Sequence, residues 1–264
     1  MVAMRASIGC AVVLAADAAG ASPEVQLPGA RDVNADGFAI LPDGLDESWI
    51  ARLRTAIDSV ESGTGVRRRR DVYAIRGLLR RAPGIRELLN LPLVRSLVEP
   101  ILGPGFFAVS GTLFDKTPRA NWKVAWHQDL SIAVRARVEM PGFGPWSTKA
   151  GVPHVQPPVS VLEGMLAVRF HLDDCGEDNG ALRVIPGSHR LGRLSAERIR
   201  EVVDATAARI CTAPVGAIVV MRPLCVHASS SATQAQNRRV IHLELVARDL
   251  PPPMEWHDAT RAAP

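Results

Sequence analysis

The sequence has few cysteines, and they are not spaced to hold a structural metal. The four residues, Cys10, Cys175, Cys211 and Cys225, include no CxxC pair, the spacing that is typical of structural zinc sites. A chain of 264 residues can bury a sizeable core without a disulfide framework. We therefore expect reduced thiols and a cytoplasmic protein.

The sequence also lacks a long apolar run. No stretch reaches the roughly 20 residues of a transmembrane helix, so we expect no membrane partner. Residues 1–22 have one arginine, a short apolar run and small residues, as a signal peptide has, but Asp17 interrupts that run. We expect residues 1–31 to be a leader that is disordered or reflects an incorrect start site, and residues 32–264 to form one domain.

Aromatic residues are scarce, at 5% of the chain with a single tyrosine. No basic stripe is interleaved with them, which argues against nucleic acid as a partner. The net charge of +4 comes largely from arginine, and the densest basic cluster spans residues 65–76. The arginines at 67–70 favour a solvated face, with attraction of an anionic substrate as the functional alternative.

The pattern of expected elements changes near residue 105 from helical to β. Before it, residues 45–60 carry apolar side chains at helical spacing, and residues 83–103 predict one or two helices broken at Leu91–Pro92. After it come short runs rich in β-branched residues, and a helix that Ser195 would cap. The expected strands lie within residues 106–114, 122–129, 165–173, 181–187, 216–221, 225–229 and 238–247. This order predicts an α+β domain with a mainly β core, whose sheet closes or sandwiches into a barrel.

One connection stands out among these strands. Residues 137–158 are rich in proline and glycine and too long for a tight turn. Connections of this length are commonly functional or disordered, so we expect a lid-like loop here.

Two His-x-Asp pairs occur in strand-like runs, at His127 and Asp129 and again at His171 and Asp173. Because side chains two apart share one face of a strand, either pair could offer two ligands to a metal. Iron(II) that must also bind a bidentate cosubstrate and oxygen needs two histidines and one carboxylate, with its other positions open. Each pair is therefore a candidate metal site only if the rest of the chain supplies a third ligand for it.

The remaining histidines differ in how well they suit that role. The candidates are His154, His189, His227, His242 and His257. His227 follows a strand, and Arg238 comes eleven residues later at the start of the next. In an antiparallel pair these two side chains can face one cavity, where a guanidinium can bind a carboxylate through two parallel hydrogen bonds.

Three motifs in this order, "WHQDL", "DDCGEDNGALRVIPGSH" and "HASSSATQAQNRR", resemble the phytanoyl-CoA dioxygenase family of iron(II)- and 2-oxoglutarate-dependent oxygenases. The similarity covers roughly residues 35–250. It implies a double-stranded β-helix, or jelly-roll, with helices packed around it. It also implies iron(II) as the metal, with 2-oxoglutarate and oxygen as cosubstrates.

Transferred residue by residue, the resemblance places the metal ligands, and with them the catalytic centre, at His127, Asp129 and His227. It places the anchor for the distal carboxylate of 2-oxoglutarate at Arg238. Halogenating relatives lack the carboxylate ligand, so the presence of Asp129 favours hydroxylation.

Three further cosubstrate contacts follow from the same resemblance. They are Gln128, inside the His-x-Asp pair, Ser229, two positions after the distal histidine, and Trp146, in the expected lid. The reaction that the resemblance implies is hydroxylation of an unactivated C–H bond of a small metabolite, anionic in one interpretation, with release of succinate and carbon dioxide.

The second pair then has a different interpretation. Strand alternation places Arg169, His171 and Asp173 on one face, which would line the barrel interior if the apolar face packs against helices. We expect Arg169 and His171 to contact substrate or support the ligands, and Asp173 to orient the following turn. For Lys116 and Arg183 a surface salt bridge is favoured over an interior contact.

A different class of function remains open at this stage. A metal-binding barrel of cupin type could be an isomerase, a hydrolase or a ligand-binding module, although such a module has no need of a cation at Arg238. The substrate and the oligomeric state are left open.

Overall fold

The computed structural model describes residues 30–60, 66–68, 72–234 and 236–261. The leader expected at 1–31 lies outside this range except for its last two residues, with which helix α1 (Ala30–Ala35) begins. The arginine cluster is only partly described, in strands β2 (Val66–Arg68) and β3 (Val72–Arg76), and no strand was expected there.

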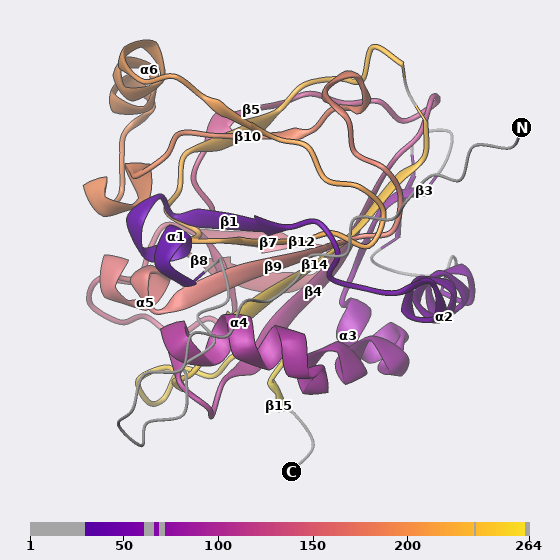
Figure 1. The fold of residues 1–264 in the computed structure, drawn as a ribbon. Coiled ribbons are helices and arrows are strands. Elements are labelled where there is room, and N and C mark those ends of the chain that lie inside the picture. The colour runs from indigo at the N-terminus through magenta and orange to yellow at the C-terminus, as the bar shows by residue number, and fades with distance from the viewer. Residues whose placement is uncertain (1–29, 61–65, 69–71, 235, 262–264) are drawn as a thin grey trace, which may run out of the picture.

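Two antiparallel sheets face each other and form the double-stranded β-helix (Figure 1). The major sheet contains, in spatial order, β1 (Phe38–Leu41), β12 (Ile218–Met221), β9 (Met165–His171), β14 (Arg238–Val246), β4 (Phe107–Lys116), β3 and β2, with β15 (Thr260–Arg261) paired to β4. The minor sheet contains β11 (Arg209–Cys211), β10 (Leu182–Val184), β13 (His227–Ser229) and β5 (Val124–His127). The expected α+β class with a jelly-roll core is confirmed.

Helices cover the outer face of the major sheet (Figure 1). They are α2 (Glu47–Asp58), α3 (Leu78–Arg81), η1 (Pro83–Asn90) and α4 (Pro92–Leu102), while α5 (Val159–Glu163), η2 (Glu177–Asn179), η3 (Ser188–Leu191) and α6 (Ala196–Ala205) lie elsewhere. Helix α2 buries Ile50, Leu53 and Ile57 in the cluster that also contains Val168 and Leu243 of the sheet. Apolar side chains therefore occupy the outer face, and strand alternation turns the polar ones inward.

The helix ends follow from local chemistry. Helix α6 begins as expected, with the Ser195 hydroxyl accepting the backbone N–H of Arg198 at 3.2 Å. The two front helices separate at Leu91–Pro92, also as expected. The second helix, α4, contains Pro100 in its last turn and ends at Gly103, whose φ of 90° takes it out of the helical region.

The segment 137–158, expected to be a loop, contains a β-hairpin. Strands β7 (Trp146–Lys149) and β8 (Val152–Val155) pair with each other, and β8 also pairs with β6 (Ile132–Ala133). The two turn residues, Ala150 and Gly151, both have positive φ, at 52° and 80°, as a tight hairpin turn requires. Alanine at the first position hid the turn signal, since asparagine, aspartate or glycine is the usual residue there.

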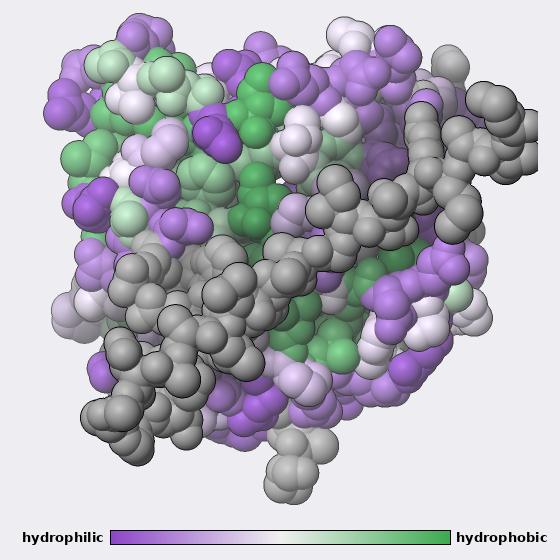
Figure 2. Space-filling view, viewed as in Figure 1, coloured by the Kyte–Doolittle hydropathy of each residue, from purple (hydrophilic) through white to green (hydrophobic). Residues whose placement is uncertain are grey.

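The face of the molecule in Figure 2 is hydrophilic at its edges, and hydrophobic side chains gather towards its middle. The described residues with large exposed apolar side chains are Leu191, Ile210 and Val215. Within the described ranges, no helix is both long and apolar enough to span a bilayer.

Candidate metal centre

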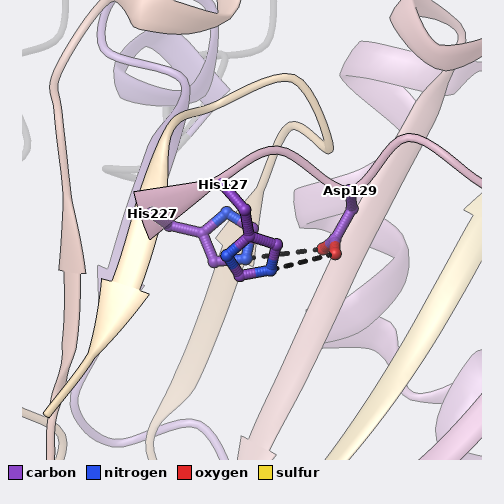
Figure 3. A group of neighbouring side chains, drawn as sticks. All are labelled: His127, Asp129 and His227. Carbon is purple, nitrogen blue, oxygen red and sulfur yellow. Dashed lines mark ion pairs between the residues drawn. The ribbon is translucent and has the colours of Figure 1, made fainter. Parts of the chain in front are cut away.

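Two histidines from neighbouring strands of the minor sheet lie opposite each other. His127 ends β5, His227 begins β13, and the antiparallel register places the two directly across from one another. Asp129 follows two residues after His127, and its backbone N–H donates to the Pro223 carbonyl at 2.9 Å. Figure 3 shows both rings turned towards the Asp129 carboxylate.

The ligand atoms of these three residues form a compact group. His127 Nε2 lies 3.6 Å from one carboxylate oxygen of Asp129, and His227 Nε2 lies 3.6 Å from the other. The two imidazole centroids are 4.2 Å apart, and the candidate ligand atoms all lie within 4.8 Å of one another. In the described part of the chain this is the one such group of three.

Backbone hydrogen bonds orient both rings for metal binding. The carbonyl oxygen of Ala125 lies 2.9 Å from Nδ1 of His127, and that of Cys225 lies 2.9 Å from Nδ1 of His227. A carbonyl only accepts, so each network assigns the proton to Nδ1 and leaves the lone pair on Nε2. The free nitrogens are the ones that face Asp129, an orientation found in metal-binding histidines.

The electrostatics keep a carboxylate between two histidines. Burial alone would raise the pKa of Asp129, but attraction by His227 and by the neighbouring His127 holds it below its usual range. Burial lowers the pKa of His227 to about 4 against the attraction of Asp129. For His127 burial also lowers the pKa, but Asp129 outweighs it and the net shift is upward. An ionised Asp129 and a neutral His227 are the protonation states that a metal requires.

The group lies in a cavity of about 390 Å³ between the two sheets. Two histidine nitrogens and one carboxylate on one side of a site leave further positions open, which is the arrangement preferred by non-haem iron(II). The residues present thus fit iron(II). Other residues that line the cavity are Arg76, Ser110, Thr112, Phe114, Trp122, Val124, Ser131, Lys149, His154, Arg169, Leu182, Ala228, Ser229, Arg238, His242 and Glu244.

One end of the cavity is strongly cationic. Arg238 is buried there with 3% exposure, and its Nη1 donates to the Gly180 carbonyl. Ser229, also buried, lines the same end and accepts a hydrogen bond from Lys116 Nζ at 3.2 Å. The structure thus brings two of the predicted cosubstrate residues, Arg238 and Ser229, into one cavity with the candidate ligands.

Lys116 corrects the sequence-based expectation of a surface salt bridge. Its side chain is fully buried, and Nζ also donates to the Ser230 carbonyl at 2.6 Å. Burial and the neighbouring Arg238 lower its pKa to about 7. The antiparallel register pairs Lys116 of β4 with Arg238 of β14, so a cation on each strand points inward. Arg183 makes no surface salt bridge with a described residue and instead lies 5.1 Å from the Trp126 ring centre.

Arg169 adds a third cation to this interior. It is buried, lines the cavity and has Nη1 3.2 Å from Nδ1 of His242. Burial lowers its pKa to about 10. Within the described residues, no carboxylate lies within ion-pair distance of Arg169, Arg238 or Lys116. Buried charge without a partner is costly, so this end is suited to an anion.

The other end of the cavity carries residues that sequence reasoning missed. Lys149, Arg76 and Glu244 line it, and His154 lies among them. Lys149 is in the β7–β8 hairpin, far in sequence from the motifs, and Glu244 continues the inward alternation of Arg238 and His242 along β14. That alternation is the signal that could have identified Glu244.

Two of the predicted cosubstrate contacts do not reach the cavity. Gln128, the first residue after β5, is buried away from the cavity, where its amide nitrogen donates to the carbonyls of Gly192 and Leu224 and its oxygen accepts from Leu194 N. Its neighbours His127 and Asp129 are the two that line the cavity. Trp146 lies outside the lining as well and packs in an apolar cluster near Arg137.

The second His-x-Asp pair lies outside the candidate metal group. His171 is 2% exposed and neither of its ring nitrogens has a hydrogen-bond partner among the described residues. Asp173 accepts hydrogen bonds from Arg239 at 2.8 and 2.9 Å and from Arg54 at 2.9 Å. The inward face expected for Arg169 is confirmed by the cavity lining, whereas His171 is buried and is not among the residues that line the cavity.

Comparisons with known proteins agree with this geometry. The phytanoyl-CoA dioxygenase (PhyH) family model matches residues 33–240. An L-proline trans-4-hydroxylase from Streptomyces griseoviridis is 25% identical over 242 residues, which cover 78% of this chain and 81% of that protein.

Solved structures show the same fold at low identity. EctD from S. alaskensis with 2-oxoglutarate and 5-hydroxyectoine is 18% identical with a TM-score of 0.67, covering 89% of this chain and 83% of its own. AviO1 from Streptomyces viridochromogenes Tue57 is 22% identical with a TM-score of 0.60, covering 84% and 95%. From the family match together with the site, we conclude that the chain belongs to the phytanoyl-CoA dioxygenase family and is a dioxygenase dependent on iron(II), 2-oxoglutarate and oxygen.

Proposed function

We propose that the protein hydroxylates an unactivated C–H bond of a small metabolite and releases succinate and carbon dioxide. The observation that carries the proposal is the position of His127, Asp129 and His227 in one cavity with Arg238. A metal and an anion held in one enclosed space are the two requirements of 2-oxoglutarate chemistry. The names of the relatives, a proline hydroxylase and a structure that contains 5-hydroxyectoine, support hydroxylation of a small molecule.

In this proposal His127, Asp129 and His227 hold iron(II) through two imidazole nitrogens and one carboxylate oxygen. Iron bound there supplies the activation of oxygen and the oxidation of the C–H bond. The backbone carbonyls of Ala125 and Cys225 orient the Nδ1 atoms, so that both Nε2 atoms face the proposed metal position.

Arg238 is the proposed anchor of the distal carboxylate of 2-oxoglutarate. Its guanidinium can donate two parallel hydrogen bonds to a carboxylate, and the Gly180 carbonyl holds one of its nitrogens in place. The Ser229 hydroxyl, oriented by Lys116, is a further donor at this end. Arg238 and Ser229 are buried, and the low-polarity surroundings strengthen their contacts to an anion.

The test is succinate formation from 2-oxoglutarate with iron(II), screened against a metabolite library for compounds that stimulate it. We expect stimulation by at least one compound, with a hydroxylated product that contains an oxygen atom from O₂. Absence of turnover with every compound, together with absence of iron-dependent 2-oxoglutarate binding, contradicts the proposal. That outcome would favour the cupin-type isomerase, hydrolase or binding module, which the family match disfavours.

A further inference from the structure

The end of the cavity opposite Arg238 has its own carboxylate. Glu244 lies six residues after Arg238 on the same face of β14, which corresponds to about 20 Å along an extended strand. Its side chain is 23% exposed and faces the cavity. A 2-oxoglutarate molecule anchored at Arg238 is much shorter than this distance, so Glu244 is left for the substrate.

A lysine shares this end without pairing with that carboxylate. Lys149 Nζ donates to the Ser131 hydroxyl at 2.6 Å, and no carboxylate of the described residues lies within ion-pair distance of it. Lys149 lines both the metal cavity and a second cavity of about 220 Å³ next to it, and Arg76 also lines both. The two cavities are therefore adjacent and share part of their walls.

Glu244 and Lys149 thus lie near each other without forming an ion pair. Burial raises the pKa of Glu244 to about 7, and repulsion by Asp129 adds to the effect, against a hydrogen bond from Ser110 and attraction by Lys149 and Arg76. Among the described residues, the ionisable side chain within ion-pair distance of Glu244 is His242, whose Nε2 lies 4.0 Å away. A half-buried carboxylate and a half-buried ammonium that do not pair with each other can each be stabilised by a ligand group of opposite charge.

We propose that this end binds a small zwitterion of the amino-acid class, with its carboxylate at Lys149 and Arg76 and its ammonium at Glu244. The inference rests on the proposed function, because it assigns the substrate of the same metal site. A purely anionic substrate would leave Glu244 without a cationic ligand group and place a second negative charge beside it. A purely cationic substrate would leave Lys149 unpaired, and only a molecule with both charges satisfies both groups.

The test uses direct binding to the complex of the protein with iron(II) and 2-oxoglutarate, kept free of oxygen and measured by calorimetry. The probes are the standard L-amino acids, β-alanine and γ-aminobutyrate. Each probe that binds is compared with its N-acetyl form, which lacks the ammonium, and with its primary amide, which lacks the carboxylate. We expect at least one zwitterion to bind, and each modification to weaken it by about tenfold or more.

Two variants assign the contacts to residues. Glu244→Gln should remove the preference for the amino acid over its N-acetyl form and keep the preference over the amide. Lys149→Gln should do the reverse. A merely structural role would lower binding of all three forms together. Lys123→Gln is the matched control, since Lys123 is exposed and outside the cavity lining, and it should keep both preferences.

Two outcomes overturn this inference while the proposed function stands. They are intact iron-dependent 2-oxoglutarate binding with no zwitterion bound, and binding of the N-acetyl or amide form as tightly as the parent. Loss of iron-dependent 2-oxoglutarate binding in the unmodified protein would instead overturn the proposed function. If either variant does not fold, the comparison of the three ligand forms on the unmodified protein still decides the question.

Discussion

The two His-x-Asp pairs of this chain have the same spacing but different surroundings. His127 and Asp129 lie at the end of β5 in the minor sheet, opposite His227 of β13. His171 ends β9 in the middle of the major sheet, where the register pairs it with Val240 of β14. The spacing places two side chains on one face in both cases, and the neighbouring strand decides whether a third ligand is present.

The charges around the pairs differ in the same way. Asp129 faces two imidazoles and a cavity, whereas Asp173 is already paired with Arg239 and Arg54 at the outer end of the sheet. A carboxylate that two guanidiniums have neutralised has little left to offer a metal. The comparison shows that a metal site requires ligands whose other interactions leave the lone pairs free.

The largest expected difference is between variants that remove the aspartate of the first pair and of the second pair. Asp129→Ala should abolish iron binding and all iron-dependent turnover, because it removes one of three proposed ligands. Asp173→Ala should retain iron affinity and lower the free energy of unfolding by about 1 to 3 kcal/mol, through the loss of its hydrogen bonds to Arg239 and Arg54. Iron titration and thermal denaturation measure the two effects. The reverse pattern would show that the second pair is the metal site.

The adjacent arginines of β14 extend the comparison to the cosubstrate. Arg238 faces the cavity, and Arg239 faces Asp173. Arg238→Ala should weaken 2-oxoglutarate binding by about 1.5 to 3 kcal/mol through loss of a charge-assisted contact. Arg239→Ala is the control and should change stability more than cosubstrate affinity. Equal cosubstrate affinity in the Arg238 variant and the unmodified protein would move the anchor to another residue.

Lys116 tests whether the buried cations serve the ligand rather than the fold. Lys116→Met should raise the stability of the cosubstrate-free protein by on the order of 1 kcal/mol and lower 2-oxoglutarate affinity by a similar amount. If Lys116→Met changes neither the stability nor the 2-oxoglutarate affinity, the charge of Lys116 does not contribute to 2-oxoglutarate binding.

The same residue predicts a pH dependence. Burial and Arg238 lower the pKa of Lys116 from 10.5 to about 7, so the folded protein releases a proton that the unfolded chain retains. The free energy of unfolding should therefore rise between about pH 7 and the ordinary lysine value. Affinity for 2-oxoglutarate should fall as pH rises through about 7, because the protonated lysine is lost. Both slopes should flatten in Lys116→Met, as calorimetry at several pH values would show.

The smallest effect is expected at the histidine of the second pair. His171 is buried without a hydrogen-bond partner among the described residues, and burial beside Arg169 and Arg238 lowers its pKa well below the ordinary range. His171→Leu should leave iron and cosubstrate binding intact and change stability by less than about 1 kcal/mol, because an apolar side chain of similar size replaces an unsatisfied ring. A loss of iron in this variant would break the distinction between the pairs.

Periodicity was sufficient for most of the fold. The strands that contain His127, His171 and Arg238, the helix over 45–60 and the cap at Ser195 all follow from patterns within a few residues of the chain. The β7–β8 hairpin was missed because Ala150 adopts a positive φ, and alanine is not a residue type that indicates such a turn. Gln128 and Trp146 were assigned to the cosubstrate by resemblance alone; in the structure Gln128, just past β5, donates to backbone carbonyls, and Trp146 of β7 packs in an apolar cluster.

The sequence by itself determined the α+β class, the family and the order of the residues proposed as ligands and anchor, because these depend on local spacing and on motifs. Only the tertiary structure decided that Lys116 is buried beside Arg238, that Asp173 is already paired, and that Glu244 and Lys149 share one end of a cavity. The physical reason is that contact between strands far apart in sequence depends on register and sheet order. A single residue of shift in that register would reverse the face of every side chain.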